Sequence, residues 1–297
     1  MIQHKTVLRE EAIRYLGVLS NHHYVDCTLG GGGHTEAILD RNGTKGRVIA
    51  FELDADTIVR TKRRLKRFGA RLIVVEDNFR SIGRVTEYGM PISGILYDLG
   101  TSMDLLKSSG RGFSFLVDEP LDMRFSLSTE RTAADLIRTT RESELADLIF
   151  RYGEERLSRR IAHAIMQTRT HTSITTTREL VSVIERAVPP SYCRGRIHPA
   201  TRTFQALRIA VNDELECLSE SLEQAMALIE RGGRIVVISF HSLEDRIVKQ
   251  FFRIQKLKKT GIILTKKPIT PSREEIEKNP NCRSAKLRAL EILTPRP

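Results

Sequence analysis

The sequence predicts a doubly wound α/β fold with a mostly parallel sheet and an inserted all-helical domain. Over the first hundred residues, short apolar runs alternate with amphipathic stretches, which is typical of a parallel sheet with helices on both faces. The next convincing strand begins only after residue 230, and the interval before it is too long for a loop. Because the centre of that interval has a helical pattern, we expect it to form a domain of its own.

The expected elements follow in order along the chain. Strands are expected at 24–28, 47–51, 71–75, 94–98 and 234–239, with two further strand-like runs at 261–265 and 287–293. Helices are expected at 34–40, 55–67, 142–167, 177–187, 213–230 and 243–257. Pro189 and Pro190 end the fourth of these helices, because proline cannot continue one. The predicted domains are a first α/β part at 1–131, a helical insert at 132–211, and a second α/β part at 212–297.

The composition is that of a soluble globular protein. The chain has 297 residues, of which 40% are hydrophobic and 29% are charged, so it can bury a sizeable core. No apolar run follows Lys5, and no window reaches the length of a membrane span, which indicates a cytoplasmic protein without a membrane partner. The four cysteines lie far apart without a C-x-x-C pair, which argues against a zinc cluster and against a disulfide framework. We therefore expect no metal.

The positive charge is concentrated near the end of the sequence. The whole chain carries a net charge of +11, and residues 246–297 hold 14 lysines and arginines against 4 acidic residues. Such a local excess suggests a polyanion partner, because each phosphate that is neutralised releases condensed counterions. The alternative is a solvated basic surface that only keeps the protein soluble.

A run of four glycines lies where the first strand meets the first helix. The segment D-C-T-L-G-G-G-G-H spans Asp26 to His34, and its glycines would let the backbone approach a ligand closely. A dinucleotide fingerprint fails here, because Thr35 or Glu36 stands where its last glycine belongs, and the lysine of a phosphate-binding loop is missing. An S-adenosylmethionine site fits better, since the carboxylate of Asp26 could face the cationic part of that ligand.

Acidic residues end further strands of the predicted sheet. Glu52 ends the second strand, where two carboxylate oxygens could accept both hydroxyls of a ribose, and Asp54 is the competing candidate. Phe79 follows the third strand and could form an aromatic wall for adenine. Asp98 ends the fourth strand, at the edge where open parallel sheets hold their ligands. Each acid alone could be an ordinary surface residue, but successive strand ends of this kind indicate a binding site.

Long sequence blocks resemble a known family, the bacterial 16S ribosomal RNA cytosine-4-amine methyltransferases called RsmH or MraW. The resemblance runs nearly from end to end and is far more specific than a glycine motif. It is carried by H-K-T-V-L at 4–8, G-G-H at 32–34, D-L-G at 98–100, R-G-F-S-F at 111–115, P-L-D-M-R at 120–124, Y-G-E-E at 152–155, H-P-A-T-R-T-F-Q-A-L-R at 198–208, S-F-H-S-L-E-D-R at 239–246 and R-S-A-K-L-R at 283–288.

The resemblance implies a Rossmann-like methyltransferase that uses S-adenosylmethionine to methylate the 4-amine of a cytosine in the decoding region of small-subunit ribosomal RNA. Glu52 stands where the family usually has Asp, and Leu105 stands where it commonly has a Gln that contacts the donor. The residues that the resemblance places at the methyl donor are Gly32, Gly33, His34, Glu52, Phe79 and Asp98, with Leu105 at the substituted position.

Two residues are candidates for the chemistry itself. Asp98 is the first candidate to accept the amine proton, although a donor-binding role competes, and His241, which follows the fifth strand, could hydrogen-bond the base or a phosphate. A lone histidine is as often structural. Phe113 or Phe115 could stack on a flipped base, with burial in a core as the alternative for both.

The RNA itself is expected to contact both the insert and the basic end of the chain. For the insert, the alternative is a salt-bridged surface between domains. The expected partner is small-subunit ribosomal RNA or the assembled small subunit, and the sequence leaves open whether the chain acts as a monomer or a homodimer. The predicted RNA contacts are Phe113, His198, Arg202, Arg208, Lys286 and Arg288. A nicotinamide-dependent oxidoreductase and an RNA-binding assembly factor are the competing functions. The failed fingerprint disfavours the first, and the intact acids at the strand ends disfavour the second.

Overall fold

A computed structural model of the chain describes residues 6–100 and 110–294. It divides into two compact units, Met1–Gly100 with Leu215–Pro297, and Thr101–Glu214. We call the first the α/β unit and the second the helical unit. The helical unit begins before the predicted boundary at residue 132, because loop residues such as Phe113 and Met123 are buried in its apolar core.

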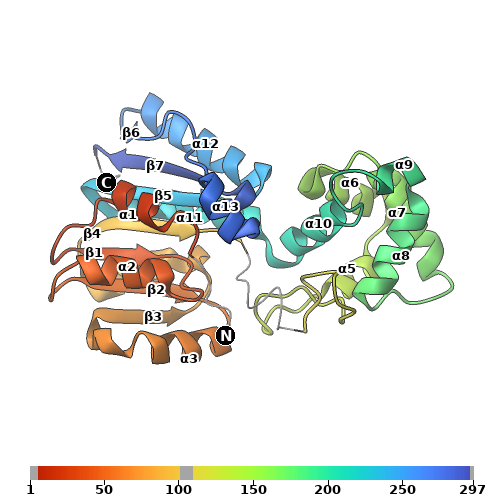
Figure 1. The fold of residues 1–297 in the computed structure, drawn as a ribbon, viewed down its shortest axis with the longest axis horizontal. Coiled ribbons are helices and arrows are strands. Elements are labelled where there is room, and N and C mark those ends of the chain that lie inside the picture. The colour runs from red at the N-terminus through yellow and green to blue at the C-terminus, as the bar shows by residue number, and fades with distance from the viewer. Residues whose placement is uncertain (1–5, 101–109, 295–297) are drawn as a thin grey trace. The chain divides into compact units, whose positions relative to one another are not determined.

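The α/β unit is built on one seven-stranded sheet. Its strands are β1 (His23–Asp26), β2 (Arg47–Glu52), β3 (Leu72–Glu76), β4 (Ile92–Asp98), β5 (Ile229–Ser239), β6 (Gly261–Ile263) and β7 (Lys286–Ile292). They lie in the order β3-β2-β1-β4-β5-β7-β6, and all neighbours are parallel except that β7 runs antiparallel to both β5 and β6 (Figure 1). The chain order reverses between β1 and β4, and open α/β sheets bind ligands beyond the carboxyl ends of the strands at such a point.

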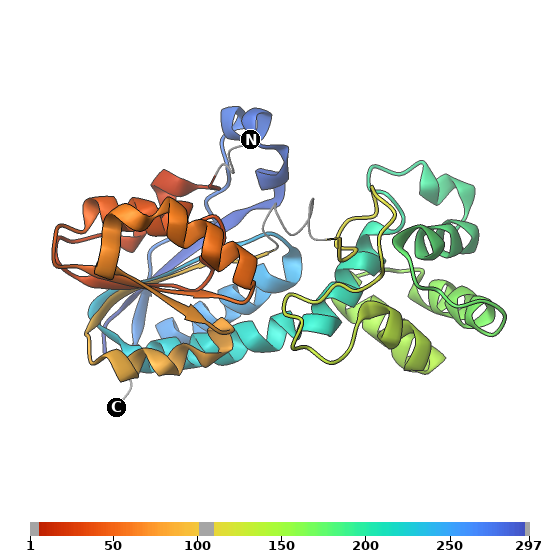
Figure 2. The ribbon, with the colours of Figure 1, turned by 90° about the horizontal axis from the view of Figure 1, so that it is seen from below.

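Helices cover both faces of this sheet (Figure 2). They are α1 (Arg9–Leu16), α2 (Gly33–Arg41), α3 (Ala55–Arg64), α11 (Glu214–Leu228), α12 (Ser242–Leu257) and α13 (Arg273–Lys278), with the 3-10 segments η1 (Lys66–Arg71), η2 (Phe79–Tyr88) and η3 (Pro280–Ser284). Alternate strand residues serve opposite faces. In β4, Ile95 and Tyr97 pack in the core with η2, α11 and α12, whereas Leu96 packs in the core with α1 and α2. The predicted doubly wound fold is confirmed.

The helical unit contains six helices among its described residues. They are α5 (Ala133–Thr139), α6 (Glu142–Gly153), α7 (Ser158–Arg169), α8 (Thr177–Ala187), α9 (Pro190–Cys193) and α10 (Thr201–Asn212). The helix expected over 142–167 is in fact α6 and α7. Glu154 ends α6 with a φ of 51°, and a Cβ added to Gly153 would lie 2.5 Å from the carbonyl oxygen of Arg202 in α10. The end of α6 therefore packs directly on the backbone of α10. Among the described residues, no helix has both the length and the apolar character that crossing a membrane requires.

Candidate functional site

The glycine run after β1 turns the chain into α2. Gly32 has a φ of 75°, and a Cβ added there would lie 2.6 Å from a methyl carbon of Thr61 in α3. A Cβ added to Gly33 would collide with Thr6. The corresponding position at Gly30 is open, with the nearest atom, the carbonyl oxygen of Thr28, 3.9 Å away. Gly32 and Gly33 are therefore required by packing within the protein, and the open space lies at Gly30.

Asp26, at the end of β1, stabilises this turn through hydrogen bonds to residues on both sides of the glycine run. The side chain is fully buried, and one carboxylate oxygen accepts a hydrogen bond of 2.6 Å from the Thr35 hydroxyl while the other accepts one of 3.1 Å from the Thr28 N–H. Burial raises the pKa of Asp26, and the bond from Thr35 is the main opposing effect. The expectation that Asp26 faces a cationic ligand does not fit this geometry, because both of its oxygens are turned inward to the loop.

Glu52, at the end of β2, links the glycine loop to the next turn. Its Oε2 accepts a hydrogen bond of 2.9 Å from the Gly30 N–H, and its Oε1 accepts bonds from Leu53 N–H at 2.9 Å and Asp54 N–H at 3.0 Å. Burial raises the pKa of Glu52, and these backbone bonds act against the shift. The competing candidate, Asp54, caps α3 by accepting from the Thr57 N–H at 2.9 Å. Geometry thus favours Glu52 as the acid that faces the loop.

Asp98 and His34 meet at the carboxyl edge of the sheet. His34 Nε2 lies 3.4 Å from Asp98 Oδ2, and the Asp98 N–H donates to the Thr28 hydroxyl oxygen at 2.8 Å. Both ring nitrogens of His34 and the Oδ1 of Asp98 are buried without a hydrogen-bond partner among the described residues. Buried polar atoms nearly always have a partner, so a group of unpaired ones at a strand end indicates a ligand.

Phe79 begins η2 directly after β3. Its ring is partly exposed and meets the Tyr97 ring edge-on, with the ring centroids 5.8 Å apart. Asn78 fixes the start of the segment by accepting from the Arg80 N–H at 2.8 Å. A partly exposed ring at the carboxyl end of β3 suits an aromatic wall for adenine. Leu105, the position that departs from the family pattern, lies outside the described residues.

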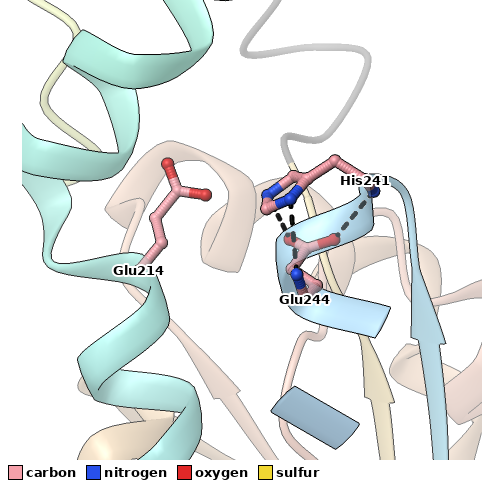
Figure 3. A group of neighbouring side chains, drawn as sticks. All are labelled: Glu214, His241 and Glu244. Atoms are coloured by element: carbon pink, nitrogen blue, oxygen red, sulfur yellow. Dashed lines mark hydrogen bonds and ion pairs between the residues drawn. The ribbon is translucent and has the colours of Figure 1, made fainter. Parts of the chain in front are cut away.

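His241 forms the N-cap of α12 at the same edge (Figure 3). Its Nδ1 accepts from the Glu244 N–H at 3.4 Å, its Nε2 lies 3.2 Å from Glu244 Oε1, and in return Glu244 Oε2 accepts from the His241 N–H at 3.2 Å. These reciprocal bonds form a capping box, so His241 has a structural role at the start of α12. Glu214, also drawn in Figure 3, begins α11, and its carboxylate accepts two bonds from Arg208 at 2.7 and 2.9 Å.

The cap predicts the outcome of replacing His241. We expect His241→Ala to lower the free energy of unfolding by about 1 kcal/mol, because the first turn of α12 loses its side-chain acceptor. His241→Asn should keep most of that stability, since asparagine is a strong N-cap. Urea unfolding of the full chain measures both variants. A stable asparagine variant that loses methyl transfer would show that the imidazole also acts in the chemistry.

The candidates in the helical unit are held by partners within that unit. Phe113 is 8% exposed and stacks on Phe125 with the centroids 5.5 Å apart, so neither ring face is open to a base in this packing. Phe115 is partly buried and stacks on the His198 ring at 4.7 Å. Arg208 forms the paired bonds to Glu214, and only 17% of its side chain is exposed.

The comparisons with known proteins settle which family this is. Residues 1–293 match the family model described as the MraW methylase family. The chain belongs to that family. Its relatives include the ribosomal RNA small subunit methyltransferase H of Dehalococcoides mccartyi, which is 49% identical over 97% of this chain and 86% of that protein. The protein of the same name in Geobacter sulfurreducens is 46% identical over 98% of this chain and 99% of its own length.

A solved structure agrees with the fold. A candidate rRNA-methylase from Clostridium thermocellum superposes with a TM-score of 0.50 at 14% sequence identity, covering 98% of each chain. At this identity the likeness concerns the fold alone. The family resemblance drawn from the sequence is confirmed by the family match.

In this methylase, Lys286 and Arg288 on β7 are tied to Asp245 of α12. Arg288 is only 9% exposed, and its Nε donates to Asp245 Oδ1 at 2.6 Å. Lys286 Nζ lies 3.5 Å from Asp245 Oδ2. Burial acts to raise the pKa of Asp245, but the bonds and charge of Arg288, followed by Lys286, outweigh it and hold the pKa below its usual value. The geometry gives Arg288 a structural role, and its contact with RNA stays a prediction.

The sequence did not point to the threonines that hold the site of this methylase in shape. Thr28 accepts from the Asp98 N–H, Thr35 donates to Asp26, and the Thr61 hydroxyl donates to the Gly30 carbonyl oxygen at 2.8 Å. Thr28 and Thr35 flank the glycine run, which was the only available signal. Thr61 lies in α3, and no local pattern connects it to the loop.

Proposed function

We propose that the chain is a cytoplasmic, S-adenosylmethionine-dependent methyltransferase that methylates the 4-amine of a cytosine in the decoding region of small-subunit ribosomal RNA. The observation that carries the proposal is the buried Asp98 Oδ1 beside His34, at the carboxyl end of β4, for which residues 6–100 and 110–294 offer no hydrogen-bond partner. The family membership and the small-subunit rRNA methyltransferase names of the relatives support the substrate class.

The residues at this edge fit the methyl donor. Gly30 leaves open space beside the loop. Glu52 Oε2 accepts one backbone bond and keeps a lone pair for a ribose hydroxyl, whereas Oε1 already accepts two backbone bonds. Phe79 offers a partly exposed ring for the adenine. The unpaired atoms of His34 and Asp98 remain for the polar end of the donor or for the base. When bound, S-adenosylmethionine supplies a methyl group that is reactive because it is attached to a sulfonium.

The chemical difficulty lies in the amine, and the role that we propose for Asp98 is to overcome it. The lone pair of a cytosine amine is delocalised into the ring, so the amine must pyramidalise as it attacks. Asp98 Oδ1 accepts a proton of the amine and stabilises the positive charge that develops on it. His34 Nε2 lies beside the other oxygen, at 3.4 Å. The rest of the catalysis is in-line positioning.

The proposed activity is tested by transfer of label to RNA. The full chain is incubated with S-adenosylmethionine carrying an isotopically labelled methyl group, and with either 16S ribosomal RNA or assembled small subunits. We expect one labelled cytosine, modified at its 4-amine, when the product is mapped by nuclease digestion and mass spectrometry. Label on another base, on ribose or on protein would contradict the proposed substrate.

Donor binding is tested separately through Glu52. We expect Glu52→Ala to weaken S-adenosylmethionine binding by about 1.5–3 kcal/mol, because the ribose hydroxyls lose a charged acceptor and the Gly30 N–H loses its partner. Calorimetry measures the affinity. Glu52→Asp, which restores the residue usual in the family, should bind within a few fold of the parent. Unchanged affinity in a folded alanine variant would move the ribose contact elsewhere.

A further inference from the structure

Helix α12 carries a row of positive charge along one side. Arg246, Lys249, Arg253 and Lys256 are all exposed, and their spacing of three, four and three residues places them within less than a quarter of the helix circumference. The row is about 15 Å long at 1.5 Å per residue. Lys258 and Lys259, also exposed, continue it beyond the helix end. We call these six residues the α12 basic row.

No acidic residue interrupts this part of the chain. Residues 246–273 contain nine lysines and arginines and no aspartate or glutamate. By contrast, Arg64 at the end of α3 and Arg67 in η1 form ion pairs with Glu36 at 2.6 and 3.1 Å. Of the 14 lysines and arginines of residues 246–297, four lie on α12 and two follow its end directly, whereas Lys286 and Arg288 lie beside Asp245.

The row begins at the candidate site. His241 caps α12 at the carboxyl edge of the sheet, so Arg246 lies in the second turn from that edge, and the row runs away from it along the outer strands (Figure 1). Lys266 and Lys267 lie at the same edge. They follow the end of β6, and because β6 runs antiparallel to β7, that end lies on the side where β7 begins. An extended polyanion that leaves the site would meet these charges in succession.

The remaining faces of α12 exclude a membrane-binding role for the helix. Its apolar side, including Val248, Phe251 and Phe252, is buried in the core of the α/β unit. Only Ile254 and Leu257 are exposed apolar residues of the helix. A helix that inserts into lipid needs a free apolar face, and α12 presents charge instead.

We infer that the α12 basic row binds the phosphodiester backbone of the substrate RNA next to the methylated nucleotide, independently of base sequence. This rests on the proposed function, since it gives RNA a path from the carboxyl edge of the sheet across the α/β unit. Lysines and arginines attract phosphates through their charge, and such contacts position a nucleic acid without reading its sequence.

The test replaces Lys249, Arg253 and Lys256 together with glutamine. All three are exposed, so the variant should fold and bind S-adenosylmethionine as the parent does. We expect affinity for a 16S ribosomal RNA transcript to fall about tenfold at moderate salt, and the slope of log affinity against log salt to flatten by about 2, from about 0.7 for each single-strand phosphate contact. A short oligouridylate should show the same loss, because no bases are read.

A matched control removes the same charge from the opposite face of the sheet. Lys62, Arg63 and Lys66 on α3 and η1 are exposed, and their replacement with glutamine should leave the salt slope unchanged. An α12 variant that keeps the parental RNA affinity and salt slope overturns the inference. An equal loss of RNA affinity in the α3 variant also overturns it. So does binding to anionic vesicles that depends on the α12 basic row. Failure of the proposed function looks different, because the parent would then transfer no methyl group to RNA.

Discussion

Replacing Asp98 with alanine is expected to slow methyl transfer to ribosomal RNA severely while leaving the fold intact. Asp98 ends β4, its backbone N–H is held by Thr28, and its Oδ1 is the buried acceptor that has no partner among the described residues. An acceptor aimed at charge that develops in the transition state contributes roughly 2.7–4 kcal/mol to lowering the barrier. The rate should therefore fall by about 100-fold to 1000-fold.

Asp98→Asn separates the charge from the hydrogen bond. The amide keeps a carbonyl acceptor but loses the negative charge, so this variant should be slower than the parent and faster than the alanine variant. Single-turnover rates at saturating donor isolate the chemical step from weakened donor binding. Asp56→Asn, an exposed acid in the first turn of α3, is the control that should retain the parental rate. Parental rates in both Asp98 variants would exclude it as the acceptor and direct attention to His241.

The sheet could be predicted from the sequence because its strands are buried on both sides. Strands β2 and β4 are continuous apolar runs that end in an acid, and the structure places their ends within a residue or two of the expected positions. The same logic placed Glu52 and Asp98 at one edge, since the carboxyl ends of parallel strands meet there. Periodicity and strand polarity therefore predicted both the fold class and the region of the site.

The direction in which a side chain points could not be predicted from the sequence. Asp26 lies at a strand end like Asp98, yet its oxygens are taken by Thr28 and Thr35, a difference set by contacts inside the loop. Arg288 belongs to a basic segment, yet it is buried because β7 is inserted between two other strands and brings Arg288 against Asp245. The number of charged residues in a segment does not predict the partners of Asp26 or of Arg288, because such partners are set by the folded structure.

The break between α6 and α7 is not predicted from the sequence, and a buried acid lies at it. Helical periodicity continues across 142–167, and neither proline nor a glycine run interrupts it. Glu155 is nevertheless fully buried between the two helices. Its Oε1 accepts from the Leu157 N–H at 2.8 Å, and its Oε2 accepts from the Tyr192 hydroxyl at 2.6 Å. Arg202 Nη1 lies 3.9 Å from the same Oε2. One carboxylate thus joins the start of α7 to α9 and α10.

Removing this carboxylate should be the most destabilising of the changes considered in the helical unit. We expect Glu155→Ala to lower the free energy of unfolding by about 3 kcal/mol, because the Leu157 N–H and the Tyr192 hydroxyl lose their acceptor inside the protein. The half-exposed Arg202 contributes less, since water can solvate it. Burial, followed by the bond to Glu155, raises the pKa of Tyr192, so the variant should also return that pKa toward its usual value.

Glu155→Gln keeps the volume and one acceptor, and should recover part of the lost stability. Urea unfolding of the full chain gives the size of each effect, and hydrogen exchange of the amides in α7 and α10 places it in the helical unit. Glu144→Ala, an exposed acid on α6, should change stability by no more than about 0.5 kcal/mol. If Glu155→Ala matched Glu144→Ala in stability and in amide protection, the carboxylate would not be what joins the three helices. A loss of RNA affinity in Glu155→Ala without loss of amide protection would instead assign Glu155 to positioning Arg202 for RNA.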